Sequence, residues 1–249
     1  MNAISEVFAR LGRSLSAHGL FVRGGFHPVP EDGVRDLADG RKARTAVLIG
    51  NAGGALWRAY SHAGAADVQG DAQAFVPHHP MDRWMRPLIE AAAREVGAEP
   101  VFPNDGPPFV PILDWAQRAE PVYRSPIGIM IHPDFGLWHV YRAVLLFPGH
   151  LDVPPSDDRP SPCETCTARP CLKVCPVDAF EPGRFAAARC ADHVEGSSGA
   201  SCRERGCLAR RACPVGVDLR YPPEAQAFHT AAMVRAVRRG FGSDFGGGG

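Results

Sequence analysis

Apolar and polar positions follow two different periods along the chain, and the two periods predict different elements. Apolar residues three or four positions apart are typical of amphipathic helices, which we predict over residues 4–15, 81–97, 112–120 and 222–239. Short apolar runs bounded by glycine, proline or polar residues are typical of strands, which we predict over residues 20–29, 45–54 and 100–104. The intervening polar stretches predict loops or short helices, above all over residues 31–44 and 67–80.

A further pair of strands is predicted over residues 127–147. Two runs of high β propensity flank the sequence HPDFG, in which Pro133 and Gly136 have the chemistry of turn residues. We therefore predict a β-hairpin. Residues 148–162 follow it, and their five prolines predict an extended linker.

The distribution of cysteine indicates the domain organisation. All eight cysteines lie between Cys163 and Cys213. The mixture of helices and strands before them predicts an α/β fold of the α+β type. We predict four segments, namely a first domain over 1–147, the linker over 148–162, a cysteine module with the last helix over 163–239, and a disordered glycine-rich tail over 240–249.

Charge and hydropathy limit the kinds of partner and the cell compartment that we expect. Basic and acidic residues number 27 each, so overall charge does not favour nucleic acid or an anionic membrane surface. No run of eighteen apolar residues and no signal peptide is present, so we expect a cytoplasmic protein with reduced thiols. Residues 184–239 contain ten arginines and five acidic residues. One interpretation is that these arginines form a surface that binds tRNA or an acidic protein. The other is that they offset the negative charge of metal-bound thiolates. We favour the second interpretation and do not expect nucleic acid as a partner.

The cysteines form two groups. The first has the spacing C-x2-C-x4-C-x3-C-P, and the second is wider and also ends in Cys-Pro. In bacterial two-cluster ferredoxins the run is C-x2-C-x2-C-x3-C-P, and its fourth cysteine binds the other cluster. By this rule one [4Fe–4S] cluster is bound by Cys163, Cys166, Cys171 and Cys213, and the other by Cys175, Cys190, Cys202 and Cys207. Two zinc sites or four disulfides would also use eight cysteines, and these alternatives stay open.

Residues 127–180 resemble two related families. The cysteine part, in which the hairpin runs into a C-x2-C…CP module, resembles epoxyqueuosine reductases, and so does the isolated Cys190 in FAAARCADHV. The hairpin part, GIMIHPDFGLWHVYRAVLLFPG, resembles CblC-type cobalamin-processing proteins, and reductive dehalogenases share this architecture. The resemblance implies a nitroreductase-like first domain, a ferredoxin-like module with two [4Fe–4S] clusters, and bound cobalamin.

The resemblance also implies which residues line the cofactor, namely His132, Gly136, Trp138 and Tyr141. The alternative for His132 is a turn histidine that bonds its own backbone, and the alternative for Trp138 and Tyr141 is a place in the core. The sequence lacks the D-x-H-x-x-G motif, so we expect cobalamin without a histidine lower ligand. It also lacks the proton-donating aspartate that the resemblance would place before the hairpin.

Together these features predict an iron–sulfur redox protein whose clusters pass electrons to a cofactor in the first domain, which the resemblance identifies as cobalamin. The electron donor would be a protein such as a flavodoxin or a ferredoxin reductase, and the ligand a corrinoid or another small molecule. Two alternatives are a ferredoxin-like electron carrier without enzymatic activity and a cobalamin-processing chaperone. The sequence identifies no catalytic residue.

Overall fold

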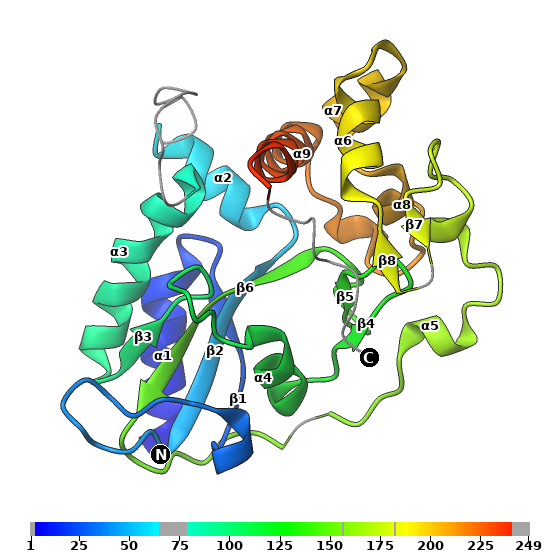
Figure 1. The fold of residues 1–249 in the computed structure, drawn as a ribbon. Helices are drawn as coiled ribbons and strands as arrows, with labels where there is room; N and C mark the ends of the chain where they lie inside the picture. The colour runs from blue at the N-terminus through cyan, green and yellow to red at the C-terminus, as the bar shows by residue number, and fades with distance from the viewer. Residues whose placement is uncertain (1–2, 65–78, 156, 182, 241–249) are drawn as a thin grey trace. The chain divides into compact units, whose positions relative to one another are not determined.

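Figure 1 shows the fold as a computed structural model, which describes residues 3–64, 79–155, 157–181 and 183–240. The chain divides into two compact units. The first consists of Met1–Pro121 and His139–Asp158, and the second of Val122–Trp138 and Arg159–Gly249. Each unit is thus built from two separate segments, and residues 122–138 pack within the unit that contains the cysteines.

The first unit is built on a four-stranded antiparallel sheet with the strand order β1-β2-β6-β3. Its strands are β1 (Phe21–Phe26), β2 (Thr45–Ala52), β3 (Glu99–Val101) and β6 (His139–Phe147). β2 and β6 pair from Thr45↔Phe147 to Ala52↔His139. Residues 46–49 of β2 are completely buried, so the apolar run that predicted this strand lies in the core.

In the described part of the chain, four helices pack against this sheet. They are α1 (Ala3–Ser16), α2 (Ala55–His62), α3 (Pro80–Glu95) and α4 (Ile112–Ala119), with a short 3₁₀ turn η1 (Pro30–Asp32). Adjacent residues of β6 reach different helices, because Arg142 pairs with Asp82 of α3 while Tyr141 bonds Glu120 at the end of α4. β6 is irregular at this point, because its register with β2 passes from Ala143 directly to Tyr141 and leaves Arg142 as the extra residue. The sequence analysis missed α2.

The hairpin predicted over residues 127–147 is wrong. Its turn is present, since His132 and Gly136 exchange two backbone hydrogen bonds of 2.9 Å. Beyond the turn, β5 (Met130–Ile131) pairs with β4 (Tyr123–Arg124), whereas β6 pairs with β2 and β3. β2 occupies one edge of β6 from His139 to Phe147, and β3 occupies the other edge at Val144–Leu146. The chain passes from the second unit to the first directly after Trp138.

The second unit is mainly helical. Its helices are α5 (Pro162–Thr165), α6 (Ala187–Glu195), α7 (Ala200–Arg205), α8 (Leu208–Arg211) and α9 (Pro223–Arg238). Besides β4 and β5 it has a short strand pair, β7 (Phe180–Glu181) and β8 (Arg184–Phe185), and 3₁₀ turns η2 (Pro170–Leu172), η3 (Ser197–Gly199) and η4 (Val217–Leu219). Two groups of buried residues form its core, and both include a cysteine: Ile127, Ile131, Leu137, Ala209 and Cys213 in one, and Ala191, Val194, Cys202 and Val234 in the other.

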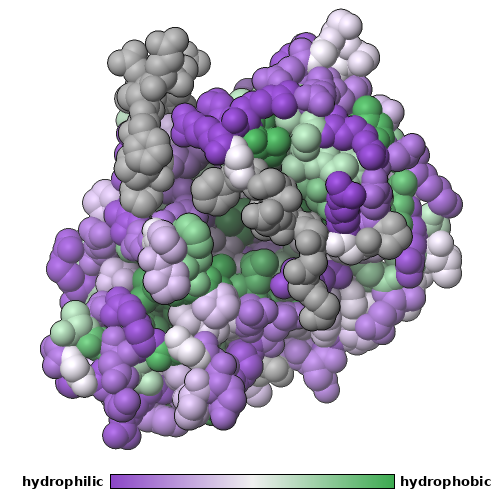
Figure 2. Space-filling model, in the orientation of Figure 1, coloured by the Kyte–Doolittle hydropathy of each residue, from purple (hydrophilic) through white to green (hydrophobic). Residues whose placement is uncertain are grey.

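The visible outer faces of α3 and α9 are mainly hydrophilic (Figure 2), as expected for helices that bury one apolar face. Among the described residues, no helix combines the length and the hydropathy needed to span a bilayer. The loop predicted over 67–80 and the tail predicted over 240–249 fall almost entirely outside the described residues.

Candidate functional site

All eight cysteines are free thiols. Four of them form a first set, which consists of Cys163, Cys166, Cys171 and Cys213. Burial raises the pKa of Cys163, and repulsion from the other three thiols of the set raises it further. Burial is also the main cause that raises the pKa of Cys171 and of Cys213, and Cys166 repels both. The four sulfur atoms are therefore close enough for the charge of one to affect the others.

The remaining four thiols form a second set, which consists of Cys175, Cys190, Cys202 and Cys207. Burial raises the pKa of Cys190 to about 12, and repulsion from the other three members contributes. Burial likewise raises the pKa of Cys202 and of Cys207, and Cys175 repels both. These repulsions divide the eight thiols into the same two sets of four that the ferredoxin spacing rule gives.

Backbone N–H groups point at some of the sulfur atoms. Ala179 N lies 3.3 Å from Cys175 Sγ. The N–H of Val215 bonds Cys213 and lowers the pKa of that thiol against the effect of burial. Such donors favour the charged form of sulfur, which is the form that binds metal.

The chemistry of the two sets suits metal-bound thiolates. In the part of the chain that the structure describes, no three His, Cys, Asp or Glu side chains are grouped around the position of a single metal ion. In each set one thiol is buried and three are partly buried, so four thiolates would repel one another and be incompletely solvated. All four are stable in the ionised form only with positive charge between them. An iron–sulfur cubane supplies that charge and offers its irons to four cysteines. The residues of each set therefore fit a four-iron cluster.

Residues 132–136 pack backbone to backbone against the segment that follows Cys213. A Cβ atom on Gly136 would lie 2.1 Å from Val215 O, and one on Gly216 would lie 2.5 Å from Phe135 O. Both glycines have positive φ, of 56° and 68°. Only glycine fits at either position, so Gly136 serves in this close contact between two backbone segments.

Trp138 is completely buried. Its ring meets that of Tyr221 edge-on, with 5.4 Å between centroids, and the Arg210 guanidinium lies 4.4 Å from the Trp138 centroid. Arg210 also donates from Nε and Nη2 to Leu137 O at 3.0 and 2.5 Å. Trp138 Nε1 is buried and has no hydrogen-bond acceptor among the described residues. Trp138 is thus a core residue with one unused donor.

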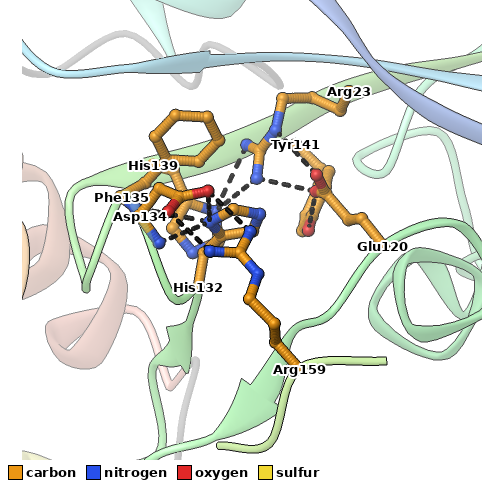
Figure 3. A network of polar contacts seen from close by, with 8 residues as sticks. All are labelled: Arg23, Glu120, His132, Asp134, Phe135, His139, Tyr141 and Arg159. Carbon is orange, nitrogen blue, oxygen red and sulfur yellow. Dashed lines mark hydrogen bonds and ion pairs between the residues drawn. The ribbon is translucent and has the colours of Figure 1, made fainter. Parts of the chain in front are cut away.

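His132 is a turn histidine (Figure 3). Its Nδ1 accepts hydrogen bonds from the backbone N–H groups of Asp134 and Phe135 at 3.0 and 3.3 Å, and its ring stacks on that of Phe135. The Asp134 carboxylate accepts two hydrogen bonds from Arg159, at 2.7 and 2.8 Å, which lower its pKa. The structure therefore supports the alternative reading of His132, and a corrinoid contact there stays a prediction.

The first unit contains a buried charged cluster that the sequence analysis did not identify (Figure 3). Arg23 Nη2 lies 2.6 Å from Glu120 Oε1, and Nη1 and Nη2 both lie 3.3 Å from His139 Nδ1. The Tyr141 hydroxyl donates to Glu120 Oε1, and the Arg23 guanidinium lies 4.7 Å from the Tyr141 centroid. Burial raises the pKa of Glu120, although Arg23 and Tyr141 oppose that rise. Tyr141 is thus bound within this cluster.

A second buried arginine, Arg142, directly follows Tyr141 in β6. Arg142 Nε donates to Asn51 Oδ1 at 2.9 Å, and Arg142 Nη1 lies 3.4 Å from Asp82 Oδ1. In the sequence, the only local sign of these two buried arginine sites is an arginine inside an apolar strand sequence, FVRGGF for Arg23 and HVYRAVLLF for Arg142. The partner of Arg23 is 97 residues away, so no sequence spacing could have identified it.

No family model and no curated protein matches the sequence. Among solved structures, epoxyqueuosine reductase from Streptococcus thermophilus is similar at 15% identity and a TM-score of 0.51, over 89% of this chain and 68% of that one. The C. elegans B12-trafficking protein CblC is similar at 14% identity and a TM-score of 0.50, over 96% and 97%. At these identities the similarity concerns the fold alone. The chain therefore has a fold similar to those of epoxyqueuosine reductase and CblC, the two groups that its sequence resembles.

Proposed function

We propose that this protein is a redox protein that holds two [4Fe–4S] clusters in its second unit. When bound, the clusters would carry single electrons. The observation that supports this proposal is the division of the thiols into two partly buried sets that interleave along the chain. Cys213 joins the first three cysteines, and Cys175 joins the last group. Bacterial two-cluster ferredoxins have the same interleaving.

The chain's own residues would hold and shield the metal. Residues 122–138 pack against Cys163, Cys171 and Cys213, which keeps one side of the first set away from water. The charge of Arg220 acts on the Cys213 thiol, so this guanidinium would supply positive charge to a region that thiolates make negative. Zinc remains an alternative, although zinc ribbons usually pair two C-x2-C knuckles and this chain has one.

The test is anaerobic reconstitution followed by metal analysis and paired Cys→Ser substitutions. We expect about eight iron atoms per chain in the unsubstituted protein. Cys163→Ser with Cys213→Ser, both in the first set, should disturb one cluster and leave about four irons. Cys163→Ser with Cys190→Ser should disturb both clusters. Zinc in place of iron would contradict the proposal, and equal iron loss in the two double variants would contradict the pairing.

A second candidate is that the protein also binds a corrinoid. The similarity to the B12-trafficking protein CblC, over 96% of this chain, favours it. His132, Gly136, Trp138 and Tyr141 are all buried and used within the protein, so these four as placed do not form an open cradle. Among these four residues, Trp138 has a ring N–H without an acceptor, to which a ligand could accept a hydrogen bond.

Anaerobic titration with cob(II)alamin tests the corrinoid candidate, because a change of ligation alters the visible spectrum of the corrinoid. We expect the spectrum of the base-off form. If no spectral change occurs with reduced or oxidised cobalamin, both the cobalamin-dependent reductase and the chaperone are excluded, and the electron carrier remains.

A further inference from the structure

Several arginines of the second unit form no ion pair within the described residues, and three of them are Arg205, Arg211 and Arg220. Arg205 ends α7, Arg211 ends α8, and Arg220 follows η4. Arg205 and Arg220 are exposed, and Arg211 is half-buried. Within the described residues, no carboxylate forms an ion pair with any of the three. Arg238 in the same unit differs, because it lies 2.6 Å from Asp192.

The three arginines lie together. Arg220 Nη2 donates to the backbone oxygen of Arg211 at 2.6 Å, which brings its guanidinium to the end of α8. The charges of Arg205 and Arg220 both act on the Arg211 guanidinium. Like charges held together repel one another, so this arrangement opposes folding. Such a concentration of positive charge attracts an anionic partner.

An exposed apolar side chain accompanies the arginines. Val217, the first residue of η4, is 42% exposed, and its backbone oxygen accepts a hydrogen bond from Arg220 N at 3.3 Å. Protein interfaces combine an apolar centre with charged surroundings and are enriched in arginine. A nucleic-acid backbone is bound by cations and needs no exposed valine. The combination therefore favours an acidic protein.

The arginines are also close to the proposed cluster ligands. Arg205 precedes Cys207 by two residues, and Arg211 precedes Cys213 by two residues. Two residues span at most about 7 Å of extended chain. Cys207 belongs to one set and Cys213 to the other, so a partner bound here would be near a ligand of each cluster.

We propose that Arg205, Arg211, Arg220 and Val217, here called the arginine patch, form the docking site for an acidic protein that donates electrons singly. This inference rests on the proposed function. In the step that docking serves, the reduced donor protein loses one electron and one cluster gains it, and no proton, bond or group is transferred. Because long-range attraction between exposed charges is screened by salt, the affinity should fall as ionic strength rises.

The test uses the cluster-loaded protein and a plant-type [2Fe–2S] ferredoxin, an acidic one-electron carrier, as the probe. Fluorescence anisotropy of labelled ferredoxin measures the affinity at low and high salt. The test variant is Arg220→Glu. Its matched control is Arg235→Glu, which makes the same change of charge at an exposed residue of α9 outside the patch.

We expect Arg220→Glu to weaken the affinity about 10-fold and Arg235→Glu to change it less than about 2-fold. Reversal of all three arginines should remove the salt dependence. Val217→Ser should weaken binding and leave the salt dependence unchanged, because it removes an apolar contact and no charge.

Several results would overturn the inference. One is equal affinity for the Arg220→Glu and Arg235→Glu variants, and another is no binding of ferredoxin to the unsubstituted protein at low salt. A synthetic RNA hairpin is the second probe: if Arg220→Glu abolishes RNA binding and leaves ferredoxin affinity unchanged, the patch binds nucleic acid instead. Iron analysis and dithionite reduction of the same samples separate the two proposals. Intact clusters with patch-independent docking refute the docking site alone, whereas a protein without iron refutes the proposed function.

Discussion

Replacing Arg23 by methionine tests how far the first unit depends on its buried ion pair. Methionine retains the length and apolar character of the arginine stem, so packing against the ring of Tyr141 is largely kept. The substitution removes the guanidinium that bonds Glu120 and His139. Glu120 is then left as a buried carboxylate without its cation.

The structure sets the size of the expected effect. The Arg23 side chain is 0% exposed and that of Glu120 is 8% exposed, so water cannot replace the lost partner. Breaking a buried ion pair by removing one partner costs about 3–5 kcal/mol. An exposed pair provides the control: Lys42, 78% exposed, lies 3.1 Å from Asp36. Lys42→Met should cost less than about 1 kcal/mol.

The loss of stability caused by Arg23→Met should increase with pH. Burial raises the pKa of Glu120 in the folded protein above the ordinary value of 4.5, and Arg23 opposes this rise. The folded state therefore binds the proton more tightly than the unfolded state, and stability falls as pH rises through this window. Without Arg23 the folded pKa rises further and the window widens upward. Arg23→Met should therefore become more destabilising as the pH rises above the ordinary glutamate pKa of 4.5.

Native-state hydrogen exchange on peptides from β2 measures the free energy of opening of the first unit. The double variant Arg23→Met with Glu120→Gln should be more stable than Arg23→Met alone, because it leaves neither charge buried. The reasoning fails if Arg23→Met costs no more than Lys42→Met. It also fails if the cost of Arg23→Met grows as the pH falls.

Three further predictions concern the second unit. Gly136→Ala should destabilise this unit and reduce iron retention, because the new Cβ would lie 2.1 Å from Val215 O. The control is Gly33→Ala, which is also at positive φ but has open space around it. This control should lower stability by only about 1–2 kcal/mol in thermal unfolding. Trp138→Ala should cost about 3–5 kcal/mol in urea unfolding, and unchanged stability would show that this side chain does not support the core. Removal of metal by an anaerobic chelator should expose residues 163–220 to protease before the first unit, and equal cleavage of both would argue against metal-coupled folding.

Local pattern identified the elements that depend on neighbouring residues. β2 was predicted from its apolar run and α9 from its helical spacing, and both are present. The division of the thiols was also drawn from the sequence, because cluster binding fixes short spacings between ligands, and it stays a prediction. Strand pairings between segments far apart in the sequence could not be predicted from local pattern. β6 was assigned to a hairpin because a turn and a second β-rich run precede it, yet its partners are β2 and β3.

The buried ion pair shows the same limit at the level of side chains. Arg23 lies in FVRGGF, where alternation gives no reason to expect a buried charge. Its burial is stable only because Glu120, 97 residues later, lies at the end of α4 beside β1. His132 was closer to prediction, because turn histidines commonly bond their own backbone and this one does.

The interrupted course of the chain has a consequence for how this protein can be divided and how it is made. The second unit takes residues 122–138 from the middle of the sequence and returns to it only at Arg159. A fragment that begins at the proline-rich linker would contain all eight cysteines and would lack Ile127, Ile131 and Leu137, which belong to the core around Cys213. Such a fragment is not a transferable ferredoxin cassette. During synthesis, residues 122–138 are translated before any cysteine, so the core that this apolar segment shares with Cys213 is completed only after Cys213 has been made.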